Sequence, residues 1–359
     1  MLPGRFLLPS RRLPDDRVPE LQPTANLVYY RRYATLIPWR GTHILMQPHA
    51  RTGYALSALA AVVWASTAPG LSYLITRYAI PGLTLALWRD LLIAVVCAGG
   101  LLAFRPALLR IGTRAIVQLA LTGMISIGMY HALWLWSVTL NGAAIAVVLI
   151  YTYPVFVALG AWLLFREQIT KAHIVALALA LAGCALVVRA YDPAILRISW
   201  TGAVIGLLTA LTHTVYVLIG QRNAPSISPW TTLAYTMIFG ALTLVALALA
   251  ADYLAPSTRS YLWSIEAPSA WVILAMIAVG PTLGGYALFT QSLRYIPGKV
   301  AGLISVIEAP VAALIAVTLL GERLELLQVV GIVLILVAVV LPRFAARVQQ
   351  TATLVASRG

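Results

Sequence analysis

The chain is a series of long apolar stretches separated by short polar segments. Each stretch is continuous over about 20 residues, the length that an α-helix needs to cross the hydrocarbon core of a bilayer. Continuous apolar runs favour helices, because the strands of a membrane barrel alternate between apolar and polar positions. Ten stretches are therefore predicted to be membrane-spanning helices: 53–75, 82–104, 115–138, 143–165, 172–190, 199–220, 228–250, 270–292, 298–320 and 326–344.

The second half of this series repeats the first at a constant offset. Three residues spaced twelve positions apart have identical counterparts 156 positions later: Tyr130, Gly142 and Pro154 match Tyr286, Gly298 and Pro310. A repeat of this length predicts two homologous halves of five helices each, 53–190 and 198–344. Because five is an odd number, the second half enters the bilayer from the opposite side. The predicted fold class is an all-α integral membrane protein with two inverted five-helix repeats, an architecture that recurs among secondary transporters.

Composition supports a chain embedded in a lipid bilayer. Hydrophobic residues make up 61% of the sequence, charged residues 10%, and the mean hydropathy is +0.90. A soluble protein carries about 25% charged residues. The chain has a net charge of +14, which would indicate nucleic-acid binding if the basic residues formed a patch. Here 19 of the 25 Lys and Arg residues fall on the side that holds both termini and 5 on the other. This bias predicts a plasma-membrane protein with cytoplasmic termini and no nucleic-acid partner.

The two ends differ from the apolar centre. Residues 1–52 contain eight arginines and seven prolines and lack the apolar core of a signal peptide. We interpret them as a disordered cytoplasmic tail, or place the start of translation at Met46. Residues 345–359 are predicted to be a cytoplasmic C-terminal tail. Cys97 and Cys184 lie inside predicted spans and lack metal-ligand spacing, so we expect neither a disulfide framework nor a metal or cofactor.

Turn signals and prolines recur at equivalent positions of the two halves. Asn141–Gly142 and Pro297–Gly298 are typical of tight turns and predict two helical hairpins. Pro154 and Pro310 follow twelve residues later, within spans, where proline removes one helical hydrogen bond and frees the carbonyl four residues earlier. The freed carbonyls would be those of Ile150 and Val306. In lipid they need another partner or a water-filled cavity, which favours kinks beside a central cavity over inert packing kinks.

Several of these segments resemble a known family. They are LWRDLLIA, the stretch from GMYHALWLWSVTLNGA to YTYPVFVALGAWLLFRE, and GGYALFTQSLRYIPGKVAGLISVIEAPVAALIAVTLLGERL. Residues 53–344 are similar to the ten-helix EamA-like permeases of the drug/metabolite transporter superfamily, including the acidic residue that ends each half, Glu167 and Glu322. The resemblance implies export or exchange of small metabolites, amino acids or drugs. It also implies a cavity between the first, third, fourth, sixth, eighth and ninth helices.

Glu308 is the most informative single residue. It lies about ten residues into the ninth predicted span, near the bilayer midplane and two residues before Pro310. A charged acid at such a depth costs about 2.5–3.5 kcal/mol on insertion scales, so intramembrane acids are functional candidates. Glu308 either binds a substrate amine, carries a coupling proton, or is a neutral acid bonded to the opened backbone.

Polar aromatic residues and histidines cluster in three other spans. The candidates for substrate contact are Tyr130, His131 and Trp134 in the third span, His213 and Tyr216 in the sixth, and Tyr286 and Gln291 in the eighth. Aromatic rings with polar tips suit a cavity for amphipathic small molecules. The alternative is that they fill the core of the helix bundle, which is at least as good an interpretation for Trp134.

Arg89 and a group of glycines complete the candidate residues. Arg89 matches an arginine often seen at this place in the resembled family, where it either binds a substrate carboxylate or extends to the outer interface as an anchor; we favour the anchor. Its neighbour Asp90 should point away from it, because successive helical residues face different directions. A distorted and flexible stretch of the eighth span is predicted from Gly280, Pro281, Gly284 and Gly285, and this span is expected to act as a gate.

The sequence thus favours a secondary transporter that takes a small-molecule substrate by alternating access. No GxxxxGK[ST] loop is present, so any coupling uses a proton or a counter-substrate. Export is the favoured direction, with uptake or exchange as alternatives. An intramembrane enzyme is disfavoured because GxSxG and HExxH are absent. A passive channel is disfavoured by the repeat and by Glu308.

Overall fold

The computed structural model describes residues 50–194, 199–254, 260–320 and 324–356, which all belong to one compact unit, Ile44–Gly359. Predictions that fall on residues 1–49, including the Met46 start, and on Glu322 lie outside these ranges. The described residues form helices and turns without any strand, so the all-α prediction is confirmed for this part of the chain.

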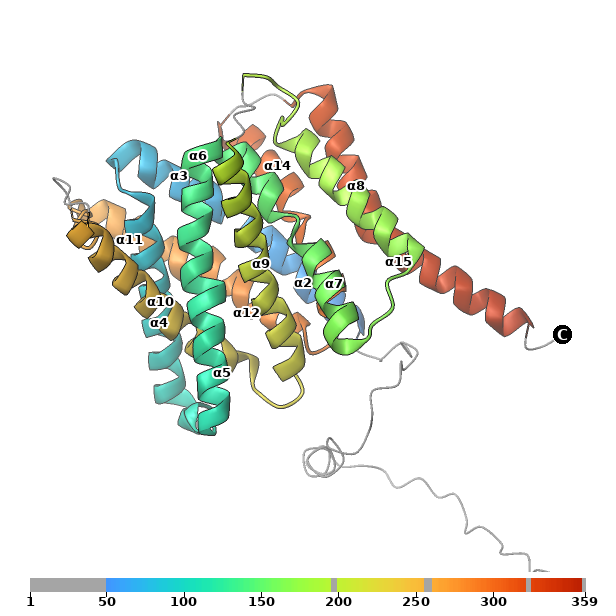
Figure 1. Cartoon of the computed structure of the whole chain (residues 1–359), viewed down its shortest axis with the longest axis horizontal. Helices are drawn as coiled ribbons and strands as arrows, with labels where there is room; N and C mark the ends of the chain where they lie inside the picture. Colours follow the sequence, from blue (N-terminus) through green and yellow to red (C-terminus); the bar gives the residue numbers. More distant parts are fainter. Residues whose placement is uncertain (1–49, 195–198, 255–259, 321–323, 357–359) are drawn as a thin grey trace, which may run out of the picture. The chain divides into compact units, whose positions relative to one another are not determined.

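The first half contains a series of helices that run back and forth (Figure 1). They are α2 Ala50–Trp64, α3 Thr67–Tyr78, α4 Gly82–Phe104, the 3₁₀ turn η1 Pro106–Leu109, α5 Thr113–Gly123, the π-helical segment η2 Met124–Met129, α6 Tyr130–Ile150, α7 Tyr153–Phe165 and α8 Lys171–Val187. Gly142 interrupts α6 with φ 78° and ψ 163°, a backbone conformation that glycine adopts without steric cost. The chain reverses there between its run through α5 and α6 and its return through α7, at the predicted turn (Figure 1).

The second half follows the same order. Its elements are α9 Trp200–Asn223, α10 Pro229–Leu254, α11 Pro268–Ile277, the π-helical segment η3 Ala278–Thr282, α12 Leu283–Ser292, α13 Gly298–Ser305, α14 Glu308–Leu320 and α15 Leu326–Ala356. Among the described residues, eight helical stretches are long and apolar enough to cross a membrane, and α7 and α8 are shorter apolar helices. The helix α15 continues to Ala356, so the segment predicted to be a tail from residue 345 begins as part of this helix.

The two halves pack through matched helix pairs. The helix α8 packs on α15 and α4 packs on α10, while α2 packs on α12 and α6 packs on α9. Small residues permit the close approach of α8 and α15, because a Cβ atom added to Gly183 in α8 would lie 2.7 Å from the Gly331 carbonyl oxygen in α15. Cys184, beside that contact, is fully buried and its thiol is free.

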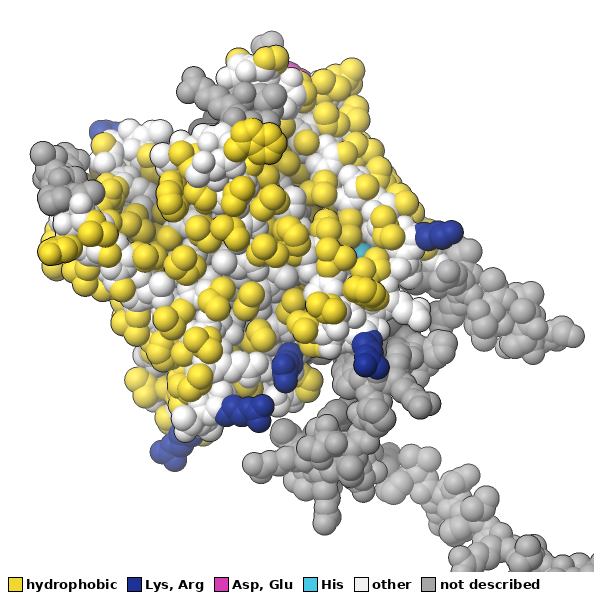
Figure 2. All heavy atoms as spheres, viewed as in Figure 1, with side chains coloured by type: hydrophobic (Ala, Val, Ile, Leu, Met, Phe, Trp, Pro, Cys, Tyr) yellow, Lys and Arg dark blue, Asp and Glu magenta, His cyan; other side chains and the backbone are white. Residues whose placement is uncertain are grey.

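The outer surface is apolar over most of its height. Figure 2 shows hydrophobic side chains across the middle of one face, with Lys and Arg side chains mostly along one edge. Large apolar side chains such as Leu102, Leu163 and Val333 are exposed on α4, α7 and α15. So many exposed apolar side chains indicate a surface that faces lipid, because contact between this much apolar area and water would be unfavourable.

Three of the long helices are interrupted near their middles. The helix α2 ends at Trp64 before α3, α6 ends at Ile150 before α7, and α13 ends at Ser305 before α14. Pro154 and Pro310 lie in the first turns of α7 and α14. Backbone N–H groups in the first turn have no acceptor within the helix, so the N–H that proline lacks is not missed there. The predicted kinks are therefore complete breaks.

The carbonyl that Pro310 frees at the second break has found another partner, one of the two outcomes predicted for it. The Val306 carbonyl accepts a hydrogen bond from the Ala309 N–H at 3.1 Å, one residue closer along the chain than the bond that Pro310 removes. The two π-helical segments η2 and η3 also lie at nearly equivalent positions of the repeat. Distortion in this region is consequently shared by both halves, although only η3 contains a proline, Pro281.

Candidate functional site

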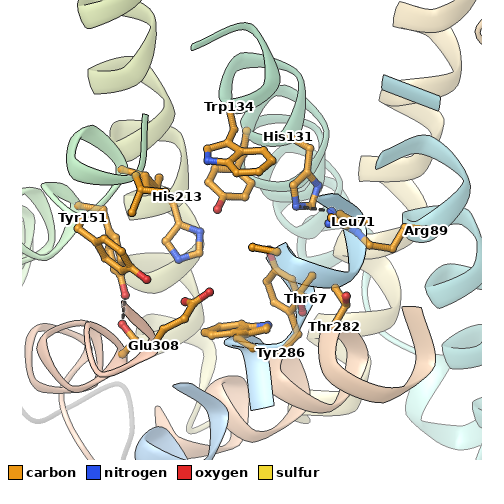
Figure 3. Close-up of a pocket in the computed structure, with 17 residues that line it drawn as sticks. Thr67, Leu71, Arg89, His131, Trp134, Tyr151, His213, Thr282, Tyr286 and Glu308 are labelled. Carbon is orange, nitrogen blue, oxygen red and sulfur yellow. Dashed lines mark hydrogen bonds between the residues drawn. The ribbon is translucent and has the colours of Figure 1, made fainter. Parts of the chain in front are cut away.

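A cavity lies where the interrupted helices meet. Its volume is about 150 Å³, measured over the positions that the centre of a water molecule can occupy, and its walls come from α2, α3, α4, α6, α7, α9, η3, α12, α13 and α14. Seven of the nine residues predicted to contact substrate line it: Arg89, Tyr130, His131, Trp134, His213, Tyr286 and Glu308 (Figure 3). Such a cavity, with aromatic walls and a few convergent polar groups, is typical of a small-molecule site.

The helix breaks place backbone and side chains at the cavity wall. Thr67 starts α3, Tyr151 follows α6, and Ser305 and Glu308 flank the break between α13 and α14. Discontinuous helices in transporters offer polar backbone groups to a substrate in this way. The breaks and the cavity therefore form one structural feature.

Glu308 is the first residue of α14 and its half-buried side chain faces the cavity (Figure 3). Tyr151 lines the same cavity (Figure 3). Among the residues that the structure describes, no lysine, arginine or histidine forms an ion pair with Glu308. An acid in this position is available to a cationic group that enters the cavity.

Arg89, Asp90 and His131 form a buried polar cluster on the other side of the cavity. The Arg89 Nε and Nη2 atoms donate to Asp90 Oδ1 at 3.1 and 3.0 Å. The His131 Nδ1 atom lies 2.6 Å from Asp90 Oδ2, and its Nε2 atom lies 2.7 Å from Arg89 Nη2. Asp90 is completely buried, and both of its oxygens are occupied.

Two predictions about this cluster are wrong. Arg89 does not extend to the membrane interface, since its side chain is only 5% exposed and its head group lies inside the bundle. Arg89 and Asp90 also do not point apart, because the long arginine side chain folds back along the helix and brings its guanidinium to the neighbouring carboxylate. The helix fixes the directions of the Cβ atoms of Arg89 and Asp90. The three methylene groups of arginine are long enough to bring the guanidinium back to the Asp90 carboxylate.

Aromatic rings enclose the cavity between these two polar regions. His213 lies 5.0 Å from the Tyr130 ring and 4.6 Å from the Tyr153 ring, measured between ring centroids. Tyr286 packs edge-on against Trp64 at 5.0 Å. The His213 Nδ1 atom is buried without a hydrogen-bond partner among the described residues. Aromatic packing of this kind builds a rigid wall with polar edges.

Two predicted contact residues do not line the cavity. Tyr216 is 1% exposed, its hydroxyl bonds to Thr290 Oγ1 at 2.5 Å, and its ring supports Tyr286 from behind. Gln291 lies near the end of α12 and is absent from the cavity wall. Both residues lie on helices that contribute to the cavity wall, but on faces of those helices that point away from the cavity.

The glycines of the eighth predicted span have different surroundings. A Cβ atom added to Gly285 would lie 2.4 Å from the Trp64 ring, whereas Gly280 has no atom within 4 Å of that position and Gly284 has only Val63 at 3.5 Å. Gly285 therefore allows α12 to approach α2 closely. Gly280 and Pro281 lie in the π-helical segment η3, so the predicted distortion is present; gating by this stretch stays a prediction.

The end of the bundle near Gly298 is closed by polar contacts between the halves. Lys299 Nζ lies 2.9 Å from Glu167 Oε2 and donates to the Gln168 carbonyl at 3.0 Å. Gln221 donates to Glu167 Oε1 at 2.6 Å and accepts from the Gly298 N–H at 2.7 Å. We call these residues the Glu167–Lys299 latch: Glu167, Gln168, Gln221, Gly298 and Lys299.

Sequence reasoning missed a further set of residues that line the cavity. They are Trp64, Thr67, Tyr151, Tyr153, Thr282 and Ser305. Each lies within five residues of a proline in a predicted span, at Pro69, Pro154, Pro281 or Pro310. The neighbourhood of the intramembrane prolines was the signal that could have identified them, because a helix break exposes the residues beside it.

The fold and the cavity define a multi-pass membrane protein with a central polar site between two repeats. The EamA-like transporter family matches the chain over two segments, residues 51–189 and 200–343. This chain therefore belongs to the EamA-like transporter family and is a transporter rather than an enzyme.

Individual relatives agree with this assignment. An "Uncharacterized transporter" of Archaeoglobus fulgidus is 25% identical over 245 residues, which cover 67% of this chain and 82% of that protein. A "Probable terminal-alkyne amino-acid exporter" of Streptantibioticus cattleyicolor is 30% identical over 278 residues, covering 76% of this chain and 87% of that protein. A solved crystal structure at 17% identity superposes with a TM-score of 0.69 over 83% of this chain and 98% of its own, and shares the fold.

Proposed function

We propose that the protein is a secondary transporter that exports small metabolites, such as amino acids or drug-like amines, across the cytoplasmic membrane by alternating access. The observation that carries the proposal is the cavity at three helix breaks, whose walls hold Glu308 and Arg89 among aromatic rings. Broken helices around a midplane site are a recurrent design of carriers. The name of the Streptantibioticus cattleyicolor relative supports amino acids and the export direction.

The proposed topology has ten membrane-spanning helices in two inverted repeats, with both termini in the cytoplasm. The turn at Gly142 and the matched helix pairs support ten spans, because α6 continues into a return helix and α8 pairs with α15. The distribution of Lys and Arg supports the orientation. The Glu167–Lys299 latch then lies at the cytoplasmic end.

Metabolite uptake or exchange by the same fold is the alternative. Export, uptake and exchange would all use the same cavity. They differ in what drives the cycle, which is a gradient of a coupling proton or of a counter-substrate. The fold fixes no direction by itself.

Untargeted mass spectrometry of the medium tests the proposal. Cells would express the wild type, Glu308→Gln, or an empty vector, with Glu266→Gln as a control for an exposed acid outside the cavity. A metabolite class enriched outside with the wild type and the control, but reduced with Glu308→Gln, is the expected result. Depletion of a metabolite from the medium by the wild type would contradict export in favour of uptake.

A further inference from the structure

We propose that the cavity binds a zwitterionic α-amino acid between two opposite walls, with Arg89 receiving its carboxylate and Glu308 its ammonium group. This inference rests on the proposed transport function and names the substrate class of the same site. Arg89 and Glu308 both line the cavity and face it from different sides (Figure 3).

Arg89 retains unused donors after its contacts within the protein are made. A guanidinium group carries five N–H donors, and the hydrogen bonds of Arg89 to described residues use Nε and Nη2 only. The Nη1 atom makes no hydrogen bond to any described residue, although the side chain lines the cavity. The two N–H groups of Nη1 diverge from one atom, so each can donate one charge-assisted hydrogen bond to a carboxylate oxygen.

Asp90 and His131 fix the position of that head group. Because a guanidinium cannot accept a hydrogen bond, Nε2 of His131 must be the acceptor at 2.7 Å from Arg89. Nδ1 then carries the proton and donates it to Asp90 Oδ2. The cluster consequently contains a neutral imidazole, one cation and one anion, with Asp90 saturated. Arg89 is the member that can still bind an anionic group.

Glu308 has the complementary character. Its side chain lines the cavity together with Tyr151 and has no cationic side-chain partner in the described part of the chain. Tyrosine faces and a carboxylate together favour an ammonium group, through cation–π attraction and a charge-assisted hydrogen bond. A buried carboxylate without a partner is costly, so a cationic ligand gains from binding there.

The space between the two walls supplies further polar atoms. Tyr130 lines the same cavity as Arg89 and Glu308, and its ring packs against the rings of His131 and His213. The His213 Nδ1 and Thr282 Oγ1 atoms are buried, line the cavity and lack protein partners among the described residues. Buried polar atoms without partners cost stability, and a polar ligand satisfies them. Trp64 and Trp134 provide apolar surface for the side chain of the amino acid.

An amine without a carboxylate, or an acid without an amine, would use only one wall. The amine would leave the Nη1 donors of Arg89 unpaired, and the acid would place two carboxylates in one cavity with a single available cation. Both losses reduce affinity, because unpaired or like charges in a confined site are unfavourable.

Binding to the purified full-length protein tests this assignment. The probes are two matched series: L-norleucine, its methyl ester, pentylamine and hexanoate; and L-phenylalanine, its methyl ester, 2-phenylethylamine and 3-phenylpropionate. Quenching of tryptophan fluorescence reports occupancy, since Trp64 and Trp134 lie in the wall. At least one zwitterion should bind, and its three analogues should each bind at least about tenfold more weakly, the effect of one lost charge-assisted hydrogen bond.

Variants assign each pole. The double variant Arg89→Gln/Asp90→Asn preserves charge balance and should remove the preference for the zwitterion over its methyl ester. Glu308→Gln should remove the preference for the zwitterion over the corresponding acid. Arg222→Gln and Glu266→Gln change exposed residues of the same types and should leave both preferences intact. Size-exclusion profiles that match the wild type establish that each variant is folded.

Three outcomes would overturn the two-wall assignment. They are a methyl ester that binds as tightly as its zwitterion, variants that preserve both preferences, and failure of both zwitterions to bind. Medium profiling separates this failure from that of the proposed function. Export of a metabolite that is not an amino acid would keep the transporter and overturn the substrate class.

Discussion

Lys299 and Glu167 join the two repeats, with 2.9 Å between Nζ and Oε2 and each side chain 12% exposed. Glu167 follows the end of α7 and Lys299 lies in the first turn of α13, so the ion pair links segments that no covalent turn connects. Gln221 on α9 adds a third element to the contact. In the proposed alternating-access cycle, we expect this latch to open when the cavity closes on the opposite side.

Breaking the latch should shift the protein toward the opposite state. Lys299→Met leaves Glu167 with only Gln221 as a partner, and a partly buried hydrogen bond to a charged group contributes about 1.5–3 kcal/mol. Spin labels at the exposed positions Arg166 and Arg294 should then show a longer mean separation. Lys171→Met, at an exposed lysine, is the matched control. An unchanged distance distribution in Lys299→Met would contradict a gating role for the latch.

The pH dependence of substrate binding should depend on Glu308. An amino-acid ammonium group is bound by the ionised carboxylate, so affinity should fall as pH is lowered and the acid becomes protonated. Glu308→Gln should bind more weakly at neutral pH and show a flat profile between about pH 5 and 8, where α-amino and α-carboxyl groups of the free amino acid keep their charges. Tryptophan quenching measured across this range checks both curves. A Glu308→Gln profile that follows the wild type would remove this residue from the site.

Tyr153 should stabilise the meeting point of two helix breaks. Its hydroxyl bonds to Ser305 and donates to the Gly302 carbonyl at 3.2 Å, which connects α7 to α13. Tyr153→Phe should lower the free energy of unfolding by about 1 kcal/mol, the usual net contribution of a buried hydrogen bond. Thermal unfolding in detergent measures the change, with Tyr73→Phe as the exposed control. Equal midpoints for both variants would show that the bond contributes nothing to stability.

Gly285 should tolerate no side chain, whereas Gly280 should accept one. A Cβ atom at Gly285 would lie 2.4 Å from the Trp64 ring, and overpacking of this kind costs about 1–3 kcal/mol. Gly280 belongs to the same span and has open space around it. Gly285→Ala should therefore lower the thermal midpoint and displace the cavity residue Trp64, while Gly280→Ala should not. Similar midpoints would mean that α2 and α12 are less closely packed than the structure indicates.

The apolar pattern and the repeat predicted the general architecture because both depend on averages over many residues. Hydrophobic spans, the turn at Gly142 and the cavity position of Glu308 required no knowledge of tertiary packing. Glu308 was identifiable because an acid at bilayer depth is costly wherever it points.

Finer features depended on directions that spacing alone does not determine. Tyr216 and Gln291 lie on the expected helices but outside the cavity wall. A small rotation of a helix about its axis decides which of its faces lines the cavity. Arg89 reached Asp90 through the flexibility of its side chain. Prolines predicted kinks, whereas the helices stop and restart at these points, because Pro154 and Pro310 fit the first turn of a new helix.

Counterflow in proteoliposomes tests whether the protein is a carrier that works through this cavity. Vesicles containing the full-length protein would be loaded with the metabolite identified by medium profiling, and entry of its labelled form would be followed without any ion gradient. We expect transient, saturable accumulation that requires the internal metabolite and is strongly reduced in Glu308→Gln. Entry that is non-saturable and independent of internal metabolite, or that is equal in Glu308→Gln, would contradict a carrier that works through this cavity.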